Sequence, residues 1–301
     1  MTMEDSKMNM KDREEKNAVL ASTLYLVSTP IGNLSDLSER AVKVLSEVDI
    51  IAAEDTRNTM KLLYFSGISK PMISYHEHNK RESGGRIIEE LLAGRSCALV
   101  TDAGTPAISD PGEDLVRLAT ENNINVTSIP GPCAAITALS LSALSTRRFV
   151  FEGFLEGTRN QRLQRLSELK NEGRTIIFYE APHNMRQTLE LMCETFGNKR
   201  RTAICRELTK INEEVMRTTL SGALEYYTVN EPRGEYVIVL DGAQPGDDDS
   251  FFSHMSVAEH VEYYTSAGLS VMDAVKQTAR DRGVAKSVIY KEIHNSKNES
   301  D

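Results

Sequence analysis

The chain has 301 residues, enough for one large or two medium-sized domains, and 40% of them are hydrophobic, which supplies a sizeable core. The net charge is −9, so the total charge gives no indication of nucleic acid binding. No apolar run approaches the roughly 20 residues that a transmembrane helix needs. The four cysteines are scattered without Cys-x-x-Cys spacing, which disfavours a disulfide framework or a zinc cluster and indicates the reducing cytoplasm.

Residues 1–22 are polar and of mixed charge, so we expect a disordered tail. Their composition fits neither a secretory signal nor a basic amphipathic transit peptide. After the tail we expect three parts: an α/β domain over 23–145, a second α/β domain over 146–242, and a linker with a helical module over 243–301.

In the first part, short apolar runs alternate with segments of helical periodicity. The predicted strands are 24–27, 49–53, 72–75, 97–100 and 125–129, and the predicted helices are 37–48, 58–65, 82–92, one after Gly112, and 133–142. This alternation predicts a mostly parallel sheet with helices on both faces. Ligands of such sheets bind at the carboxyl ends of the strands.

A turn-rich loop, 28–36, follows the first predicted strand. A strand, a loop and a helix start in this order can hold an anion or a polar ligand. The loop lacks Gly-x-Gly-x-x-Gly, so the signal for a dinucleotide is weak, and a plain βα turn explains it equally well.

Polar side chains follow two further predicted strands. Glu54, Asp55 and Arg57 stand where an α/β active site would use them, or where they would cap and pair at the next helix. His76 and His78 would face the same way on an extended backbone. They could bind a metal, but no third ligand is evident, so we expect a substrate-facing rim, with a solvated loop as the alternative.

The segment 100–112 is the most distinctive of the chain. It follows an apolar run and packs two Gly, two Pro, two Asp, two Thr and a Ser into thirteen positions. We therefore expect a rigid loop across the carboxyl end of a buried strand, longer than most βα connections. Gly104 would let a ligand approach the backbone.

A second alternation follows, with predicted strands 149–154, 174–179, 201–205, 215–220 and 234–240 and helices 157–174 and 185–196. We expect the last, strongly apolar strand to close the fold. The helix 157–174 carries an excess of positive charge that includes Arg159, Arg162 and Arg165. A solvated face is the usual explanation, and an RNA-facing role stays open.

A linker rich in Gly and Asp leads to three predicted helices, 257–264, 271–282 and 286–295. The turn at 283–285 resembles that of a helix-turn-helix. Between 270 and 297 there are six Lys and Arg against three Asp and Glu, in a chain that is acidic in total. Lys286 and Lys291 are therefore candidate nucleic acid contacts, with a small packing module as an equal alternative.

Several of these segments together resemble the tetrapyrrole methylase superfamily, whose members use S-adenosylmethionine and have two α/β domains. Within it, the chain is similar to the branch that methylates a cytidine 2′-hydroxyl in the decoding region of 16S rRNA. The motifs that carry the resemblance are 26–36, 53–57, 75–79, 101–112, 129–132, 178–183 and 206–210.

The resemblance implies that S-adenosylmethionine binds in the cleft between the two α/β domains. The loop at Asp102 occupies the place of the superfamily's Gly-Gly-Asp-Pro loop, with Ala103 for the first Gly and Thr105 for the Asp. The cofactor residues implied by the analogy are Pro30, Asp102, Ala103, Gly104, Thr105, Pro106, Ser128, Pro130, Gly131, Tyr179, Ala181, Leu208, Gly234 and Glu235. The resemblance also implies a homodimer.

Methyl transfer from a sulfonium is an in-line displacement, so the protein must align the 2′-oxygen with the methyl carbon. A nearby base helps, because the hydroxyl is a poor nucleophile until its proton is leaving. The candidates for this base are Glu54, Asp55, His76 and Lys210. Arg57 would hold a phosphate with its planar fork.

Three other functions remain as alternatives. The first is methylation of a tetrapyrrole precursor, although this chain has Ser-Thr-Pro-Ile-Gly-Asn in place of a Gly-rich first loop. The second is a noncatalytic RNA- or ribosome-binding protein that has kept the fold. The third, a nicotinamide-dependent oxidoreductase, is disfavoured by the missing Gly-x-Gly-x-x-Gly.

Overall fold

The computed structural model describes residues 18–244, 252, 255–282 and 284–298. The chain divides into two compact units, residues 1–243 and residues 244–301. Most of the predicted N-terminal tail lies outside the described residues. Among the described residues, every helix is too short or too polar to cross a bilayer.

The first sheet of the larger unit is parallel throughout, in the order β3-β2-β4-β1-β5. Its strands are β1 (Thr23–Val27), β2 (Ile50–Ala53), β3 (Met72–Ser74), β4 (Cys97–Val100) and β5 (Asn125–Ile129). Both faces of β2 and β4 are buried, which is why these strands are continuous apolar runs. The predicted parallel sheet with helices on both faces is confirmed.

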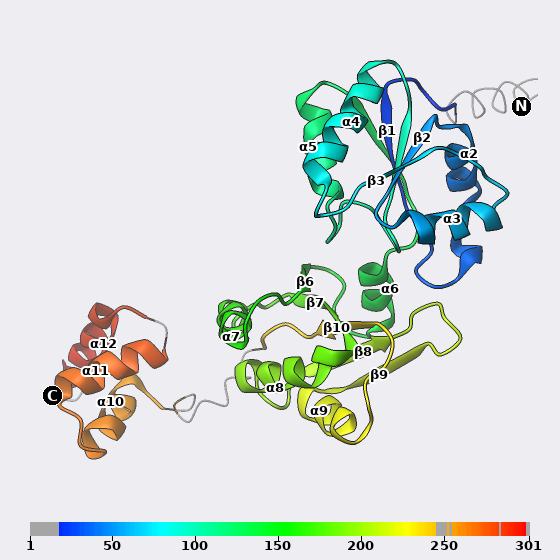
Figure 1. The fold of residues 1–301 in the computed structure, drawn as a ribbon. Helices are drawn as coiled ribbons and strands as arrows, with labels where there is room; N and C mark the ends of the chain where they lie inside the picture. The colour runs from blue at the N-terminus through cyan, green and yellow to red at the C-terminus, as the bar shows by residue number, and fades with distance from the viewer. Residues whose placement is uncertain (1–17, 245–251, 253–254, 283, 299–301) are drawn as a thin grey trace, which may run out of the picture. The chain divides into compact units, whose positions relative to one another are not determined.

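Two helices cover each face of this sheet (Figure 1). They are α2 (Glu39–Glu47) and α3 (Thr56–Phe65) on one face, and α4 (Lys80–Leu92) and α5 (Gly112–Glu121) on the other. A short 3-10 helix, η1 (Leu34–Asp36), precedes α2. The helix α6 (Ala134–Leu141) leaves this layer and packs on the second sheet, against β7 and β10.

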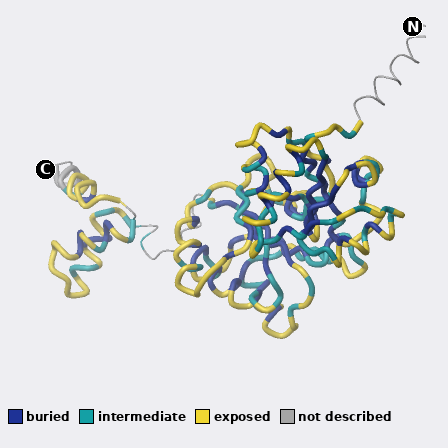
Figure 2. The backbone as a smooth tube through the Cα atoms, turned by 45° about the horizontal axis from the view of Figure 1, so that its top comes forward, coloured by how far each residue is buried: buried dark blue, intermediate teal, exposed yellow. Residues whose placement is uncertain are grey.

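The second sheet is mixed, in the order β6-β7-β10-β8-β9. Its strands are β6 (Phe149–Phe154), β7 (Thr175–Glu180), β8 (Arg201–Arg206), β9 (Glu214–Thr219) and β10 (Tyr236–Leu240). Only β6 and β7 pair in parallel. The helices α7 (Arg159–Glu168), α8 (Met185–Phe196) and α9 (Leu220–Val229) share a core with one face of this sheet, and η2 (Pro182–Asn184) precedes α8. The buried stretches of both sheets are dark blue in Figure 2.

This sheet and its helices differ from the expectation at three points. β10, the strand expected to close the fold, does not lie at an edge but at the centre of the sheet, paired with β7 and β8, and all five of its residues are buried. The helix predicted over 157–174 ends at Glu168, because the chain turns through the segment that contains Gly173 before β7. Helix α9 was missed, since its Tyr-Tyr-Thr-Val run favours a strand and only the Thr219 cap marks its start.

The smaller unit consists of α10 (Val257–Ser266), α11 (Val271–Asp281) and α12 (Lys286–Asn298). All three predicted helices are therefore present. Their shared core is small and contains Val261, Ala274, Val275, Ala279 and Ile289. The turn that resembles a helix-turn-helix includes position 283, which lies outside the described residues.

Candidate active site

The larger unit contains a cavity of about 400 Å³ at the carboxyl ends of the parallel strands. Loops from both sheets line it. The lining residues come from the loops after β1, β2, β4 and β5 and from the ends of β6, β7, β8 and β10: Ile31, Glu54, Thr101, Asp102, Ala103, Gly104, Thr105, Ile108, Ser109, Asp110, Cys133, Ala134, Phe154, Tyr179, Glu180, Ala181, Pro182, Cys205, Leu208, Glu235, Tyr236 and Val237. This is the crevice in which an open α/β sheet binds its ligand.

The loop after β4 is held by paired backbone and side-chain bonds. The Thr29 N–H donates to the Gly104 carbonyl at 2.9 Å, and the Gly104 N–H donates to the Thr29 carbonyl at 3.1 Å. The Thr105 hydroxyl donates to the Pro132 carbonyl at 3.1 Å. Gly104 has φ +87°, a conformation in which a residue with a Cβ is strained. The loop is therefore held in one conformation, and the missing side chain of Gly104 lets a ligand approach its backbone closely.

The same loop carries unusual backbone at two further positions. Ala107 and Ser109 have φ of +67° and +60°, which non-glycine residues rarely adopt. Asp110 stabilises the loop, because its Oδ1 accepts bonds from the Ala107 N–H at 3.0 Å and the Gly112 N–H at 2.7 Å. Strain of this kind persists only where the surroundings impose it, and it clusters at functional sites.

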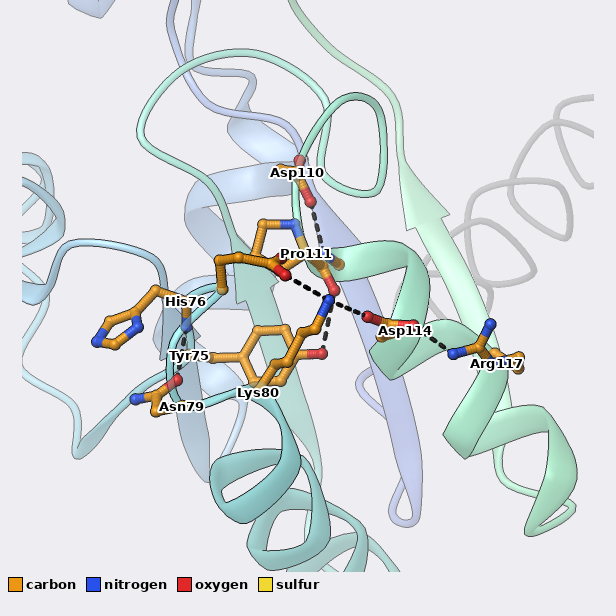
Figure 3. Close-up of polar contacts among 10 residues, drawn as sticks. Tyr75, His76, Asn79, Lys80, Asp110, Pro111, Asp114 and Arg117 are labelled. Carbon is orange, nitrogen blue, oxygen red and sulfur yellow. Dashed lines mark hydrogen bonds and ion pairs between the residues drawn. The ribbon is translucent and has the colours of Figure 1, made fainter. Parts of the chain in front are cut away.

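A polar network fixes the far end of the loop (Figure 3). The buried Tyr75 donates its hydroxyl proton to the Pro111 carbonyl at 3.0 Å. Burial raises the pKa of Tyr75 to about 12, so it remains a donor. Lys80 bridges Asp114 and Glu77, at 2.7 Å from each. These contacts attach α4 to the start of α5 and thereby to the cavity wall.

Eight of the predicted cofactor residues line the cavity: Asp102, Ala103, Gly104, Thr105, Tyr179, Ala181, Leu208 and Glu235. The other six are not among the residues that line it: Pro30, Pro106, Ser128, Pro130, Gly131 and Gly234. Two of these are needed for close packing. A Cβ on Gly131 would lie 2.8 Å from Ser28 Cβ, and a Cβ on Gly234, which has φ +84°, would lie 2.6 Å from Glu207 Cδ.

The charged side chains that line the cavity are all acidic among the described residues. They are Glu54, Asp102, Asp110, Glu180 and Glu235. Burial, followed by repulsion from Glu54, raises the pKa of Asp102 above its ordinary value. Burial also raises the pKa of Asp110, against the hydrogen bonds from the Gly112 and Ala107 backbone. The cavity therefore favours a ligand that carries positive charge or donates hydrogen bonds.

Glu54 is the one predicted catalytic residue among those that line this cavity. Its Oε2 accepts a bond from the Thr101 hydroxyl at 2.7 Å and a longer one from the Asp102 N–H at 3.4 Å. Its strand β2 lies beside β4, so the ends of the two strands bring these groups together.

Asp55 and Arg57 lie just outside the cavity and pair with each other. Asp55 caps α3, and its Oδ2 lies 2.7 Å from Arg57 Nη2. The side-chain bond from Arg57 and the bond from its backbone N–H lower the pKa of Asp55 to about 2. The Arg57 side chain is 85% exposed, so its outer edge remains accessible to a further anion.

His76 and His78 do not lie on extended backbone, because the chain turns at 77–79. Their rings meet edge to face with centroids 6.0 Å apart. His76 Nδ1 is buried without a hydrogen-bond partner among the described residues, and neither histidine lines the cavity. No group of three or more metal-ligating side chains occurs in the part of the chain that the structure describes.

Lys210 is engaged by two carboxylates. Its Nζ lies 2.8 Å from Glu207 Oε1 and 2.9 Å from Glu235 Oε2. Burial lowers its pKa, but the bonds to these two groups outweigh that effect, and the pKa is raised overall. Lys210 is therefore a cation beside the cavity, and its side chain packs so closely on Gly32 that a Cβ added there would clash with Lys210 Cγ.

The predicted RNA-binding residues differ in burial and in whether an acidic side chain neutralises their charge. Arg159 pairs with Glu194 at 3.0 Å, and Arg165 is held by Glu152 and Glu168. Arg162 is half-buried on the same helix. In the smaller unit, Lys286 and Lys291 are exposed on α12.

Other lining residues were missed from the sequence, notably Phe154, Asp110 and Glu180. Phe154 comes to the cavity because β6 has a bulge between Phe151 and Gly153, and no local pattern marks that bulge. Asp110 and Glu180 do follow β4 and β7, so their positions after strands were a usable signal. Glu180 is 3% exposed and accepts bonds from the Thr188 hydroxyl and the Ala181 N–H.

Comparison with known proteins identifies close relatives of this chain. Residues 23–223 match the model of the family described as Tetrapyrrole (Corrin/Porphyrin) Methylases. A protein of Halalkalibacterium halodurans named ribosomal RNA small subunit methyltransferase I is 47% identical over 274 residues, which cover 90% of this chain and 94% of the relative. A Bacillus subtilis protein of the same name is 44% identical, with the same coverage of both chains.

The fold is also found in solved structures at low sequence identity. A uroporphyrin-III C-methyltransferase from Thermus thermophilus, complexed with S-adenosylhomocysteine, superimposes with a TM-score of 0.51 at 15% identity, covering 73% of this chain and 97% of that chain. At this identity the similarity concerns the fold alone.

Proposed function

This chain belongs to the tetrapyrrole methylase family, and from that premise we propose that it is a methyltransferase that uses S-adenosylmethionine to modify the RNA of the small ribosomal subunit. More specifically, we propose that it methylates the 2′-hydroxyl of a cytidine in the decoding region of 16S rRNA. This acceptor follows from the resemblance of its motifs to the RNA-modifying branch of the family. With such a substrate, we also propose that the protein acts in the cytoplasm.

The observation that carries the proposal is the match between the cavity and the charge of the cofactor. S-adenosylmethionine has a sulfonium, an ammonium and a carboxylate group, so its net charge is positive, and when bound it supplies a methyl group whose leaving group is a neutral thioether. The cavity's charged lining residues are all carboxylates among the described residues. Its volume of about 400 Å³ lies within the usual range for small-molecule sites.

We assign the parts of the cofactor site by chemistry. Gly104, with φ +87°, lets the backbone of the loop after β4 approach the ligand. Apolar side chains such as Ile31, Leu208 and Val237 give the cavity surfaces that exclude water. Asp102 lines the cavity, and its carboxylate can accept bonds from cationic or hydroxyl groups.

Glu54 is our first candidate for the group that accepts the proton of the ribose hydroxyl. It lines the cavity, and its Oε2 is oriented by Thr101 at 2.7 Å. Asp55 is weakened as a base by its pKa of about 2, and Lys210 is held as a cation by Glu207 and Glu235. A positioned general base typically contributes 10²- to 10⁴-fold to such a step, by the order-of-magnitude values known for enzymes.

Substrate contacts outside the cavity are part of the same proposal. Arg57 has an exposed guanidinium edge that can hold a phosphate, and Lys286 and Lys291 offer exposed ammonium groups. We also propose that the protein is a homodimer, on the family resemblance. Sedimentation velocity at micromolar concentration tests this, and a monomer would contradict it.

The experiment that tests the function is an acceptor comparison. The purified protein is incubated with radiolabelled S-adenosylmethionine and one acceptor at a time: small ribosomal subunits that lack decoding-region methylation, free 16S rRNA, or uroporphyrinogen III. We expect label on subunits or rRNA and none on the tetrapyrrole. Label on the tetrapyrrole would favour the first alternative function, and no label on any acceptor would favour a noncatalytic RNA-binding protein.

A further inference from the structure

A second, more open space of about 740 Å³ adjoins the cofactor cavity, and we name it the acceptor groove. Four residues line both spaces: Glu54, Ser109, Asp110 and Phe154. The remaining residues of the groove are Glu77, Pro111, Glu152, Leu155, Glu156 and Arg165. A molecule in the groove therefore reaches the cofactor cavity at these four shared residues, which makes the groove the natural place for the methyl acceptor.

The charge of the groove limits which part of an RNA can enter it. Five of its lining residues are carboxylates, and its one arginine, Arg165, is held by Glu152 through bonds of 2.9 Å and 2.8 Å. Phosphates are therefore repelled from the groove. Groups that donate hydrogen bonds are favoured, and the exocyclic amino group of a nucleobase is such a donor.

Phe154 supplies an aromatic surface at the junction of the two spaces. It is 51% exposed, and its ring packs edge-on against Tyr179, with centroids 5.5 Å apart and an interplanar angle of 61°. Tyr179 is itself fixed, because its hydroxyl accepts a bond from the Ala135 N–H at 3.2 Å. The ring of Phe154 therefore has a defined orientation and can stack an unpaired base.

The bulge that brings Phe154 to the junction also presses β6 against the loop after β4. Gly153 has φ +67°, and a Cβ there would lie 2.8 Å from Ser109 Oγ. The aromatic surface and Asp110, one residue after Ser109, are consequently held in a fixed relation to each other.

The two carboxylate oxygens of Asp110 differ in their hydrogen bonds. Its Oδ1 accepts the bonds from the Ala107 and Gly112 N–H groups, whereas Oδ2 is buried and has no hydrogen-bond partner among the described residues. Leaving a buried acceptor unpaired is costly, so such an atom in a residue that lines both spaces indicates a donor that arrives with the ligand.

We propose that the acceptor base stacks on Phe154 and donates a hydrogen bond from its exocyclic amino group to Asp110 Oδ2, so that the site selects cytosine over uracil. Cytosine has this donor, whereas uracil has a carbonyl oxygen at the same position. The inference rests on the proposed function and adds the residue that reads the base.

The test compares two small-subunit substrates that differ only at the acceptor nucleotide, cytidine or uridine. The wild-type protein, Asp110→Asn and the charge-matched control Glu121→Gln, at an exposed position on α5 outside both spaces, are measured for kcat/KM on each substrate. The asparagine oxygen can keep the two backbone bonds of Oδ1, while its amino group replaces the acceptor with a donor. Binding of S-adenosylhomocysteine is measured for each protein by calorimetry.

We expect the wild type and the control to prefer cytidine by about 10- to 100-fold, as for a hydrogen bond to a charged group. Asp110→Asn should shift this ratio at least tenfold towards uridine, with cofactor affinity changed less than threefold. An equal loss on both substrates, or a cofactor affinity reduced tenfold or more, would overturn the inference. If the wild type methylates neither substrate, the proposed function fails, and the inference fails with it.

Phe154→Leu gives a second, independent variant. Stacking of one base on an aromatic side chain has a free energy that corresponds to a factor of about 10 or more, so kcat/KM on the cytidine substrate should fall by that factor. Phe154→Tyr, which keeps the aromatic face, should restore it. Loss of activity in Phe154→Tyr as large as in Phe154→Leu would contradict stacking.

Discussion

The Thr101 hydroxyl donates a hydrogen bond of 2.7 Å to Glu54 Oε2, which joins the end of β4 to the end of β2, and both residues line the cavity. The bond fixes the carboxylate and leaves Oε1 available to a ligand. Fixed orientation matters here because the acceptor oxygen, its proton and the methyl carbon must be aligned together.

Glu54→Gln should therefore lower kcat by about 10²- to 10⁴-fold, since glutamine cannot accept the hydroxyl proton. Single-turnover rates with saturating cofactor measure this effect. Thr101→Val should cause a smaller loss, while Thr101→Ser, which keeps the hydroxyl, should remain close to wild type. A Glu54→Gln variant with full turnover would exclude Glu54 as the base.

Gly104→Ala should weaken cofactor binding, because alanine is strained at φ +87° and the loop after β4 must shift. Calorimetric titration with S-adenosylhomocysteine should show an affinity lower by about tenfold, for a strain of about 1–2 kcal/mol. The matched control is Gly94→Ala. Gly94 has φ +93°, and a Cβ added there would meet no other atom within 4 Å. This variant should reduce thermal stability to a similar degree and leave the affinity unchanged. Equal affinities for the two variants would contradict the role of Gly104.

Replacing Lys286 and Lys291 together by alanine should raise KM for small subunits without changing cofactor affinity. Each lost phosphate contact should also reduce the salt dependence of binding by a slope of about 0.7–0.9. Lys43→Ala, on α2 in the larger unit, is the control for loss of an exposed lysine. An unchanged salt slope in the double variant would show that α12 does not contact the RNA.

The helical unit should lose stability in mild acid because of the buried His260. Its Nδ1 accepts a bond from Arg282 at 3.1 Å, and its Nε2 lies 3.3 Å from Asp281. Burial, followed by the charge of Arg282, lowers the pKa of His260 below its ordinary value. The unfolded state therefore binds a proton more readily, so stability is complete above about pH 6.5 and decreases as the pH falls towards the folded-state pKa.

Hydrogen exchange of α10 and α11 in the full chain, corrected for intrinsic rates, measures this effect between pH 7.5 and pH 5.5. Protection should decrease at the lower pH in the wild type. His260→Gln, which does not titrate, should show no such decrease. Equal pH dependence in both proteins would contradict the assignment to His260.

Most elements of the fold could be predicted from hydrophobic periodicity, but not their arrangement. The pattern over 185–196 has the exact extent of α8, because its apolar positions recur at helical spacing. The central place of β10 could not be predicted, since a strand's order in a mixed sheet depends on long-range pairing. Helix α9 was not predicted, because its local sequence has a weak helix propensity and the packing of Leu220, Ala223 and Tyr227 stabilises the helix instead.

In the candidate site, too, some residues could be predicted from local sequence and others could not. The loops after β2 and β4 could be predicted as parts of the site, because polar residues such as Glu54 and Asp102 follow apolar strands there. Phe154 could not be found, because only the bulge in β6 brings it to the cavity. The burial of one Asp110 oxygen is likewise a property of the folded loop and not of its sequence pattern.

The central claim is tested most directly by finding which atom of the RNA receives the methyl group. Small subunits that lack decoding-region methylation are treated with the protein and labelled S-adenosylmethionine, and the digested nucleosides are resolved by mass spectrometry. We predict 2′-O-methylcytidine from a single position in the decoding region. Label on a base, on a ribose other than that of cytidine, or on a nucleotide elsewhere in the rRNA would contradict the account.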